Sequence, residues 1–240
     1  MNIFILTGAG VSAESGLGIF QGKDGLWARF DPMKLATPEA FARHPDGVHT
    51  FYNMRRQNLL AAEPNEAHRA LARLEAGLVE RGGSLFLCTQ NVDDLHERAG
   101  SQRVAHMHGE LLKSCCTICR AVTPWREHLS IETPCPSCGR VGGLRPHVVW
   151  FGEMPLEMDA IYDGLLGADL FVSIGTSGSV YPAAGFVSEA RGRGIRTCEI
   201  NLEPSENARQ FDDARYGAAS EVVPRWVETV LAHSQGSNSD

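Results

Sequence analysis

The sequence lacks an apolar run of the roughly 18 to 20 residues that a membrane-spanning helix needs. It also lacks an N-terminal basic segment followed by an apolar stretch and a cleavage site. Positive charge is not in excess either: 22 Lys and Arg against 29 Asp and Glu leave a formal net charge of −7. We therefore expect a cytoplasmic protein with no membrane contact and no direct nucleic-acid binding, because gripping a phosphate backbone usually requires a basic surface.

Disulfide bonds are not expected, although the chain has seven cysteines. Four of them form two Cys-x-x-Cys pairs with fifteen residues between the pairs, and in a reducing compartment this spacing is typical of a closed zinc site. The predicted ligands are Cys116, Cys119, Cys135 and Cys138. Cys115 is a competing candidate, but the two-residue spacing to Cys119 favours Cys116. Four thiolates leave no open position for water, so the ion would be structural.

Short apolar runs alternate with segments of helical periodicity along most of the chain. The predicted strands are 2–7, 84–89, 170–174 and 196–200, and the predicted helices are 38–43, 46–61, 65–81, 161–168, 183–193 and 223–232. Continuous apolar strands alternating with helices predict a parallel sheet covered on both faces. The sequence therefore predicts an α/β fold, with a small metal-stabilised insertion where cysteines, prolines and glycines replace the helical pattern between residues 111 and 145.

A glycine-rich loop, Gly8-Ala9-Gly10-Val-Ser12-Ala13, follows the first predicted strand. Missing side chains at the glycines let backbone N–H groups approach a pyrophosphate, as in dinucleotide-binding proteins. A tight strand-to-helix turn is the simpler alternative. The segment after the loop, 16–25, is polar and rich in glycine, which indicates a lid over a bound cofactor rather than the second strand of an ordinary dehydrogenase.

Polar residues follow the strand 84–89, where open parallel sheets bind ligands. Asn91 and Asp93 lie there, and His108 comes shortly afterwards. A lone histidine is more often a structural hydrogen-bonding group than a base. The nearby Asn91 and Asp93, and the titration of histidine near neutral pH, nevertheless make His108 a candidate general base. His106 is the competitor, and spacing does not choose between the two.

Two further strands end in small or polar residues, and a helix carries a tyrosine and an arginine on one face. Gly175, Thr176 and Ser177 follow one strand, and Asn201, Leu202 and Glu203 follow the other. Each group could meet a nucleotide, or could be an ordinary turn. Tyr52 and Arg55 lie three residues apart, and from spacing alone a solvated surface pair is the better interpretation.

Taken together, these motifs resemble the sirtuin family, the NAD-dependent protein-lysine deacylases, from about residue 2 to residue 231. The motifs occur in sirtuin order: Gly8–Gly16, Thr89–Asp93, His108–Gly109, the four cysteines, Gly175–Ser177 and Asn201–Glu203. The resemblance implies a Rossmann-like NAD-binding domain at 1–34, 66–110 and 144–233. It also implies a small domain formed by the helical segment 35–65 and the zinc ribbon 111–143, with a disordered tail at 234–240. We expect a monomer that contacts only acylated lysines of other proteins.

The resemblance also implies a mechanism. The acyl oxygen attacks C1′ of the nicotinamide ribose and releases nicotinamide, and His108 acts as general base on a ribose hydroxyl. The products are free lysine and O-acyl-ADP-ribose. Asn91 would order the ribose and its water, Asp93 would hold the nicotinamide amide, and Phe20 would shield the reactive face. The NAD-binding residues implied in addition are Gly8, Ala9, Gly10, Ser12, Glu14, Gln21, Trp27, Gln90, Val92, Gly175, Thr176, Ser177, Asn201, Leu202, Glu203 and Ala219.

Within the family, the chain resembles the bacterial enzymes of the desuccinylase-like class. Tyr52, Arg55 and the small Ala36 stand where that class recognises acidic acyl groups, so activity on succinyl- and malonyl-lysine is expected beside deacetylation. The segment 148–152 resembles the stretch that pairs with the substrate backbone; its implied binding residues are Val148, Trp150, Phe151 and Gly152.

One position departs from the sirtuin pattern, because Gln21 stands where an arginine usually follows Phe20. The lost positive charge would weaken NAD binding. Two alternatives therefore stay open: a protein mono-ADP-ribosyltransferase, and a catalytically weak NAD-binding interaction module. The presence of His108, Asn91 and Asp93 argues against the second, because a pure binder needs no base.

Overall fold

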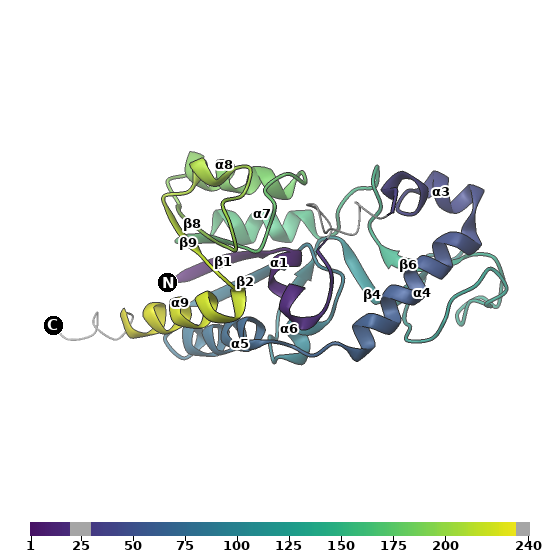
Figure 1. Cartoon of the computed structure of the whole chain (residues 1–240), viewed down its shortest axis with the longest axis horizontal. Helices are drawn as coiled ribbons and strands as arrows, with labels where there is room; N and C mark the ends of the chain where they lie inside the picture. Colours follow the sequence, from purple (N-terminus) through teal and green to yellow (C-terminus); the bar gives the residue numbers. More distant parts are fainter. Residues whose placement is uncertain (20–29, 234–240) are drawn as a thin grey trace.

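The structure is a computed structural model that describes residues 1–19 and 30–233. The molecule is elongated, with a parallel sheet and its helices at one end and a smaller antiparallel sheet with two helices at the other (Figure 1). Among the described residues, no helix is long and apolar enough to cross a membrane. The predicted disordered tail, 234–240, lies outside the described residues.

The parallel sheet has six strands in the order β3-β2-β1-β7-β8-β9. Its strands are β1 (Asn2–Thr7), β2 (Ser84–Thr89), β3 (Val104–His106), β7 (Leu170–Ile174), β8 (Arg196–Asn201) and β9 (Asp213–Tyr216). The four predicted strands are confirmed, three of them with the predicted bounds. The edge strands β3 and β9 were not predicted. The chain moves from β1 to β2 on one side and later returns to β7 on the other, which creates a switch point beside β1.

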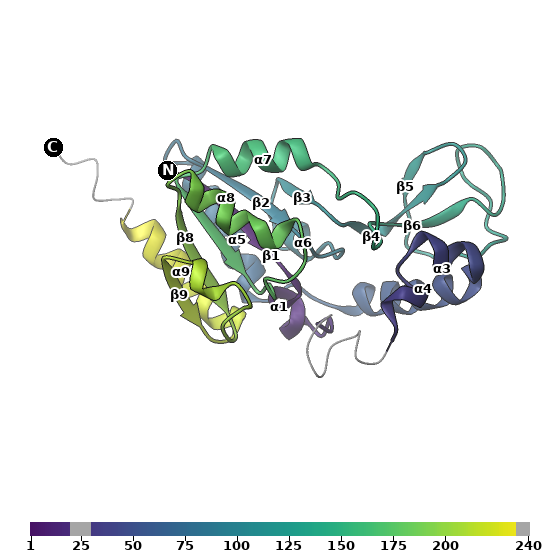
Figure 2. The same ribbon diagram turned by 90° about the horizontal axis from the view of Figure 1, so that it is seen from above.

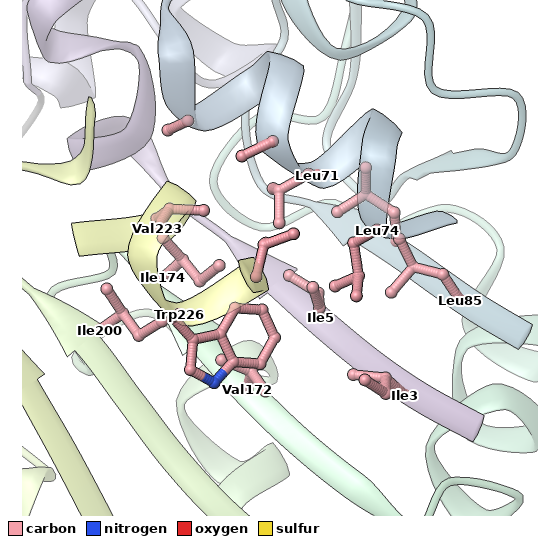
Figure 3. Packing of buried hydrophobic residues seen from close by; sticks show 14 of the residues in the cluster. Ile3, Ile5, Leu71, Leu74, Leu85, Val172, Ile174, Ile200, Val223 and Trp226 are labelled. Carbon is pink, nitrogen blue, oxygen red and sulfur yellow. The ribbon is translucent and has the colours of Figure 1, made fainter. Parts of the chain in front are cut away.

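Helices cover both faces of this sheet, as predicted. On one face, α5 (Glu66–Val79) and α9 (Ala219–His233) bury leucines and Trp226 against β1 and β7 (Figure 3). On the other face, α7 (Met158–Leu166) and α8 (Phe186–Gly192) pack against Phe4 and Phe171. The α5 helix begins where the sequence places a cap: Asn65 Oδ1 accepts a hydrogen bond of 2.9 Å from Ala67 N, and the His68 side chain completes the capping box.

The antiparallel sheet has the order β5-β4-β6 and lies beside two helices (Figure 2). Its strands are β4 (Gly109–Cys116), β5 (Val122–Pro124) and β6 (Leu144–Val148), and the helices are α3 (Pro38–Arg43) and α4 (Pro45–Ala61). Thr37 caps α3 by accepting a hydrogen bond of 3.0 Å from Ala40 N. The expected boundaries end the zinc ribbon at residue 143 and assign the residues from 144 onward to the NAD-binding domain. In the structure, β6, which begins at Leu144, pairs with β4 of the antiparallel sheet and not with the parallel strands.

The remaining described elements are short. They are α1 (Ala9–Ser12), α6 (Leu95–Arg98) and four 3₁₀ turns: Ala13–Ser15, Pro32–Lys34, Ala183–Gly185 and Ala208–Gln210. The α1 helix follows the glycine loop directly. It has only four residues, so individual N–H groups of the loop, rather than a long helix dipole, would have to meet a bound anion.

Candidate functional site

The glycine loop lies at the switch point of the parallel sheet, in close contact with the turn that follows β7. Gly8 N donates to Ile174 O at 3.0 Å, and Gly10 N donates to Gly175 O at 2.9 Å. A Cβ added to Gly8 would lie 2.7 Å from Gly175 O, and one added to Gly10 would lie 2.7 Å from Gly175 Cα. Only glycine fits at these two positions, so no side chain would separate the loop from a bound pyrophosphate, although the N–H groups of Gly8 and Gly10 themselves are already used within the protein.

Asn91 and Asp93 are brought together by the hydroxyl of Ser12. Asn91 Nδ2 donates to Gly8 O and to Ser12 Oγ, both at 3.1 Å, and Ser12 Oγ donates to Asp93 Oδ2 at 3.1 Å. Asp93 Oδ1 also accepts from Leu95 N at 3.2 Å. All three side chains are buried. Burial raises the pKa of Asp93, although both hydrogen bonds oppose the shift.

His68 supports this group and was missed by the sequence reasoning. Its Nδ1 accepts from Asn65 N at 3.3 Å, so the proton lies on Nε2, which is 3.3 Å from Ser12 Oγ. Burial lowers the pKa of His68 to about 4, so the ring is neutral near pH 7. Ser12 Oγ thus accepts from His68 and Asn91 and donates to Asp93. The capping spacing Asn65-x-x-His68 was the available sequence signal.

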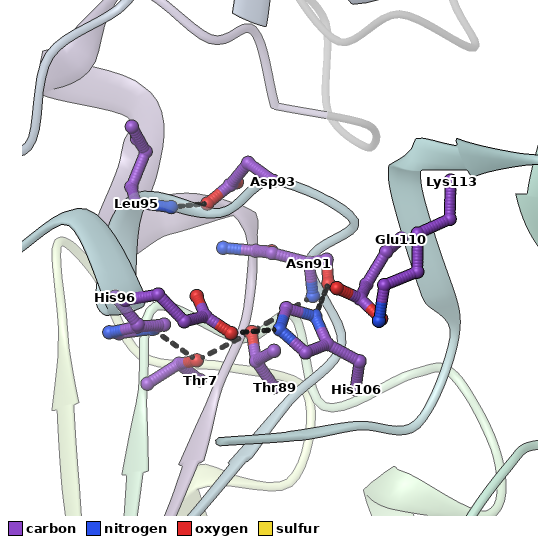
Figure 4. Close-up of polar contacts among 10 residues, drawn as sticks. Thr7, Thr89, Asn91, Asp93, Leu95, His96, His106, Glu110 and Lys113 are labelled. Atoms are coloured by element: carbon purple, nitrogen blue, oxygen red, sulfur yellow. Dashed lines mark hydrogen bonds and ion pairs between the residues drawn. The ribbon is translucent and has the colours of Figure 1, made fainter. Parts of the chain in front are cut away.

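His106 lies beneath the same loop and is already paired (Figure 4). Its Nε2 is 2.6 Å from Glu97 Oε1, and its Nδ1 is 3.4 Å from the carbonyl oxygen of Asn91. Although burial opposes it, the contact with Glu97 raises the pKa of His106. Nearby, Thr7 Oγ1 contacts both Thr89 Oγ1, at 2.8 Å, and His96 Nε2, at 3.0 Å. Because both ring nitrogens of His106 have partners within the protein, His106 is better suited to a structural role than to proton transfer.

One ring nitrogen of His108 is held by a backbone carbonyl, and the other has no hydrogen-bond partner among residues 1–19 and 30–233. Its Nδ1 lies 3.0 Å from the carbonyl oxygen of Gln90, which can only accept, so Nδ1 carries the proton and Nε2 the lone pair. Burial lowers the pKa of His108, outweighing the hydrogen bond to Gln90. A neutral imidazole with an available Nε2 is the form that a general base requires.

A cavity of about 100 Å³ joins two of the three predicted catalytic residues, Asn91 and Asp93, to the helix α4; His108 is not among the described residues that line it. Asn91, Val92 and Asp93 line it from the parallel-sheet side, and Arg55 and Asn58 line it from α4. Burial lowers the pKa of Arg55, although the neighbouring Tyr52 and Asp93 oppose the shift. Sequence reasoning placed Arg55 near the acyl group but did not identify Asn58, whose polar side chain on α4 carries no pattern of its own.

Of the three predicted acyl-recognition residues, Tyr52 and Ala36 are buried and Arg55 is half-buried. Tyr52 is only 3% exposed and Ala36 only 4%, so the interpretation of a solvated Tyr52–Arg55 pair is wrong. The guanidinium carbon of Arg55 lies 5.7 Å from the centre of the Tyr52 ring. Of the predicted substrate segment, Val148 ends β6, Trp150 is buried, and Phe151 and Gly152 form an exposed turn.

The other predicted NAD-binding residues lie on both sides of the glycine loop. Asn201 Nδ2 donates to Thr176 O at 2.7 Å, which ties the ends of β7 and β8 together, and Gln90 and Thr176 line a second cavity of about 10 Å³. Ala9 lines the larger cavity. Ser177, Leu202 and Glu203 are exposed at the same sheet edge. Glu14 accepts a hydrogen bond from Ser220 N, the residue after Ala219. Phe20, Gln21 and Trp27 lie outside the described residues.

The four predicted zinc ligands converge, and Cys115 does not join them. The sulfur atoms of Cys116, Cys119, Cys135 and Cys138 lie within 4.8 Å of one another. The Cys119–Cys135 and Cys116–Cys138 separations are 3.7 and 4.0 Å, close to the edge of about 3.8 Å expected for a tetrahedron with Zn–S bonds of about 2.3 Å. This donor set fits one structural zinc ion.

Comparison with known proteins gives consistent matches over nearly the whole chain. Residues 8–182 match the family model described as the Sir2 family. A protein from Caulobacter vibrioides named NAD-dependent protein deacylase is 66% identical over 232 residues, which cover 97% of this chain and 98% of that protein. A Salmonella typhimurium protein of the same name is 53% identical, with 95% and 84% covered. A solved mutant Sir2 homologue in complex with ADP-ribose is 40% identical, with a TM-score of 0.89 and 100% and 95% coverage.

Proposed function

The chain belongs to the Sir2 family and is an NAD-dependent protein deacylase, and we propose that it removes succinyl and malonyl groups, in addition to acetyl groups, from protein lysines. The position of Arg55 is the main observation that supports activity on acidic acyl groups. Its side chain lines one cavity with Asn91 and Asp93 and lies against the ring of the buried Tyr52. A cation at that place supports recognition of an acyl group that ends in a carboxylate.

The chemistry of recognition follows from the residue types. Arginine presents a planar fork of N–H donors that matches a carboxylate, and tyrosine adds a hydroxyl donor. Ala36 belongs to the same buried cluster as Tyr52, and its single methyl group leaves room for a longer acyl chain. The acetyl group has no carboxylate to bind but meets nothing that excludes it, so deacetylation is retained.

When bound, NAD would supply both the ribose C1′, which the acyl oxygen attacks as nicotinamide leaves, and the ribose hydroxyl that carries the acyl group in the product O-acyl-ADP-ribose. His108 takes a proton from a ribose hydroxyl with Nε2, because Nδ1 is held by Gln90 O. Asn91 and Asp93 are oriented by Ser12, and they order the ribose side and the amide side of the nicotinamide nucleoside. The bare glycine loop binds the pyrophosphate.

Arg55→Met tests the acyl class. With one peptide carrying succinyl- or acetyl-lysine, we expect kcat/KM for the succinyl form to fall roughly ten- to hundredfold, because a charge-assisted hydrogen bond contributes about 1.5–3 kcal/mol. The acetyl form should change little. Arg69→Met, at an exposed arginine of α5, is the control. Full desuccinylase activity in Arg55→Met would contradict the proposal.

The same assay separates the alternative activities. A deacylase releases nicotinamide only when an acylated peptide is present, whereas an ADP-ribosyltransferase attaches label from NAD to protein. A module that only binds NAD releases none. We also propose a cytoplasmic, monomeric protein; gel filtration and cell fractionation would test both points.

A further inference from the structure

Trp150 donates a hydrogen bond to the tyrosine that is proposed to recognise acidic acyl groups. Its indole Nε1–H lies 2.9 Å from the Tyr52 hydroxyl oxygen, across 98 positions of sequence. Both side chains are buried, at 2% and 3% exposure. The indole N–H of Trp150 is committed to the Tyr52 hydroxyl, so any effect of this N–H on a bound acyl group would pass through Tyr52.

The direction of this hydrogen bond decides what Tyr52 can do. An indole N–H can only donate, so the Tyr52 oxygen is the acceptor and its own proton is not used in this contact. Within residues 1–19 and 30–233, the contact with Trp150 is the one hydrogen bond of the Tyr52 side chain. A buried O–H without an acceptor is costly, and a substrate carboxylate would remove that cost.

Tyr52 also stays protonated in this environment. Burial raises the pKa of its hydroxyl, although the neighbouring Arg55 and the Trp150 hydrogen bond oppose the shift. A hydroxyl that accepts one hydrogen bond is polarised and becomes a better donor in the next. Tyr52 is thus a neutral donor beside a cation, which suits an anionic group and offers nothing particular to an acetyl group.

Trp150 is held in place by an ion pair formed by Arg145 and Glu153. Arg145 Nη1 and Nη2 donate to the two carboxylate oxygens of Glu153 at 2.6 and 2.9 Å, and Trp150 N donates to Glu153 Oε2 at 2.8 Å. The guanidinium carbon of Arg145 lies 3.4 Å from the centre of the Trp150 ring. The ring is therefore fixed from its face and from its backbone.

The same segment reaches the second acyl-recognition residue through its backbone. Phe151 N donates to Ala36 O at 2.9 Å, directly after Trp150 in the sequence. Adjacent residues of one segment thus hold Tyr52 and Ala36, which come from different parts of the chain.

We propose that Trp150 is a specificity-determining positioning residue: by occupying a lone pair of the Tyr52 hydroxyl, it leaves the Tyr52 proton to be donated to the carboxylate of a succinyl or malonyl group. This inference rests on the acyl class proposed above. It adds that discrimination between acidic and neutral acyl groups depends on a side chain that does not touch the acyl group.

Trp150→Phe is the test, because it keeps an aromatic ring under Arg145 and removes the N–H. On one peptide, kcat/KM for succinyl-lysine should fall about three- to tenfold, the effect of one neutral hydrogen bond, while acetyl-lysine changes less than about twofold. Trp226→Phe, an equally buried tryptophan in α9, is the control for the loss of a core indole and should leave the succinyl-to-acetyl ratio unchanged. Isothermal titration with the succinyl peptide should show the same weakening.

A double-mutant cycle isolates the contact. In a Tyr52→Phe background, Trp150→Phe should leave the succinyl-to-acetyl ratio where Tyr52→Phe alone puts it. An unchanged ratio in Trp150→Phe, or an equal loss on both peptides, overturns the inference and leaves the acyl class standing. A wild-type enzyme that does not desuccinylate overturns the acyl class itself, and this inference with it.

Discussion

The two sheets of this enzyme are stabilised by different means. The parallel sheet lies between two apolar clusters drawn from α5 and α9 on one face and from α7 and α8 on the other. The far end of the antiparallel sheet has a core of four buried residues, two of them the predicted zinc ligands Cys116 and Cys135. Stability is distributed over many side chains in the first region and concentrated in a few in the second, so a single substitution should have very different consequences in each.

Loss of a zinc ligand should have the largest effect. In Cys119→Ser, we expect the ion to be lost and the zinc-binding end to unfold, because that segment has little apolar core of its own. Deacylation should fall below detection, since β4 runs from Gly109, directly after His108, to Cys116. Circular dichroism should still show the parallel-sheet region folded. Zinc content and activity are the measurements.

Cys115→Ser is the matched control for this change. The Cys115 sulfur lies 4.0 Å from Pro146 O and outside the four-sulfur cluster. This variant should keep its zinc and its activity. Full activity of a metal-depleted Cys119→Ser protein would mean that the two regions are independent.

A core substitution in the parallel-sheet region should have a smaller, purely energetic effect. Leu74 is fully buried between α5 and the sheet, and Leu74→Ala should cost about 2–5 kcal/mol of unfolding free energy. Zinc content and the succinyl-to-acetyl ratio should stay unchanged. Urea denaturation measures the effect, with Val79→Ala at an exposed position of the same helix as control. Loss of zinc in Leu74→Ala would contradict the separation of the two regions.

The smallest effect is expected at the junction of the regions, where His108 titrates. In the proposed mechanism the neutral form of His108 is the active one, and burial holds its pKa below the ordinary 6.5, so activity should be present above that value and be lost as the pH falls through the lowered pKa. Between pH 7.5 and pH 6.5, kcat/KM should drop by less than about twofold. A pH profile measures this. A half-maximal point at or above pH 6.5 would show that burial does not govern His108.

The elements that were predicted well are those whose own residues determine them. The strands β1, β2 and β7 are continuous apolar runs that end in polar or glycine residues, and their bounds were predicted correctly. In contrast, β9 reads Asp-Ala-Arg-Tyr and carries no apolar pattern, because an edge strand needs only backbone pairing with β8.

The parts of the candidate site that a local sequence motif encodes could be predicted. The parts that depend on contacts between distant segments could not. Spacing selected the four cysteines, and the fold brings them together. Spacing could not choose between His106 and His108, because the difference is their partners: Glu97 for one, a backbone carbonyl for the other. Likewise, the sequence gives no sign that the Trp150 indole meets Tyr52.

The close packing of the glycine loop against the turn after β7 constrains how this enzyme can be re-engineered. Gly175 has a φ of +64°, and a Cβ there would lie 2.5 Å from Val11 N, while one on Gly10 would lie 2.7 Å from Gly175 Cα. Neither turn can accept even a methyl group unless the other moves. A variant designed to accept a different dinucleotide would therefore have to rebuild both turns at once, and libraries that vary one of them alone should yield almost no folded clones.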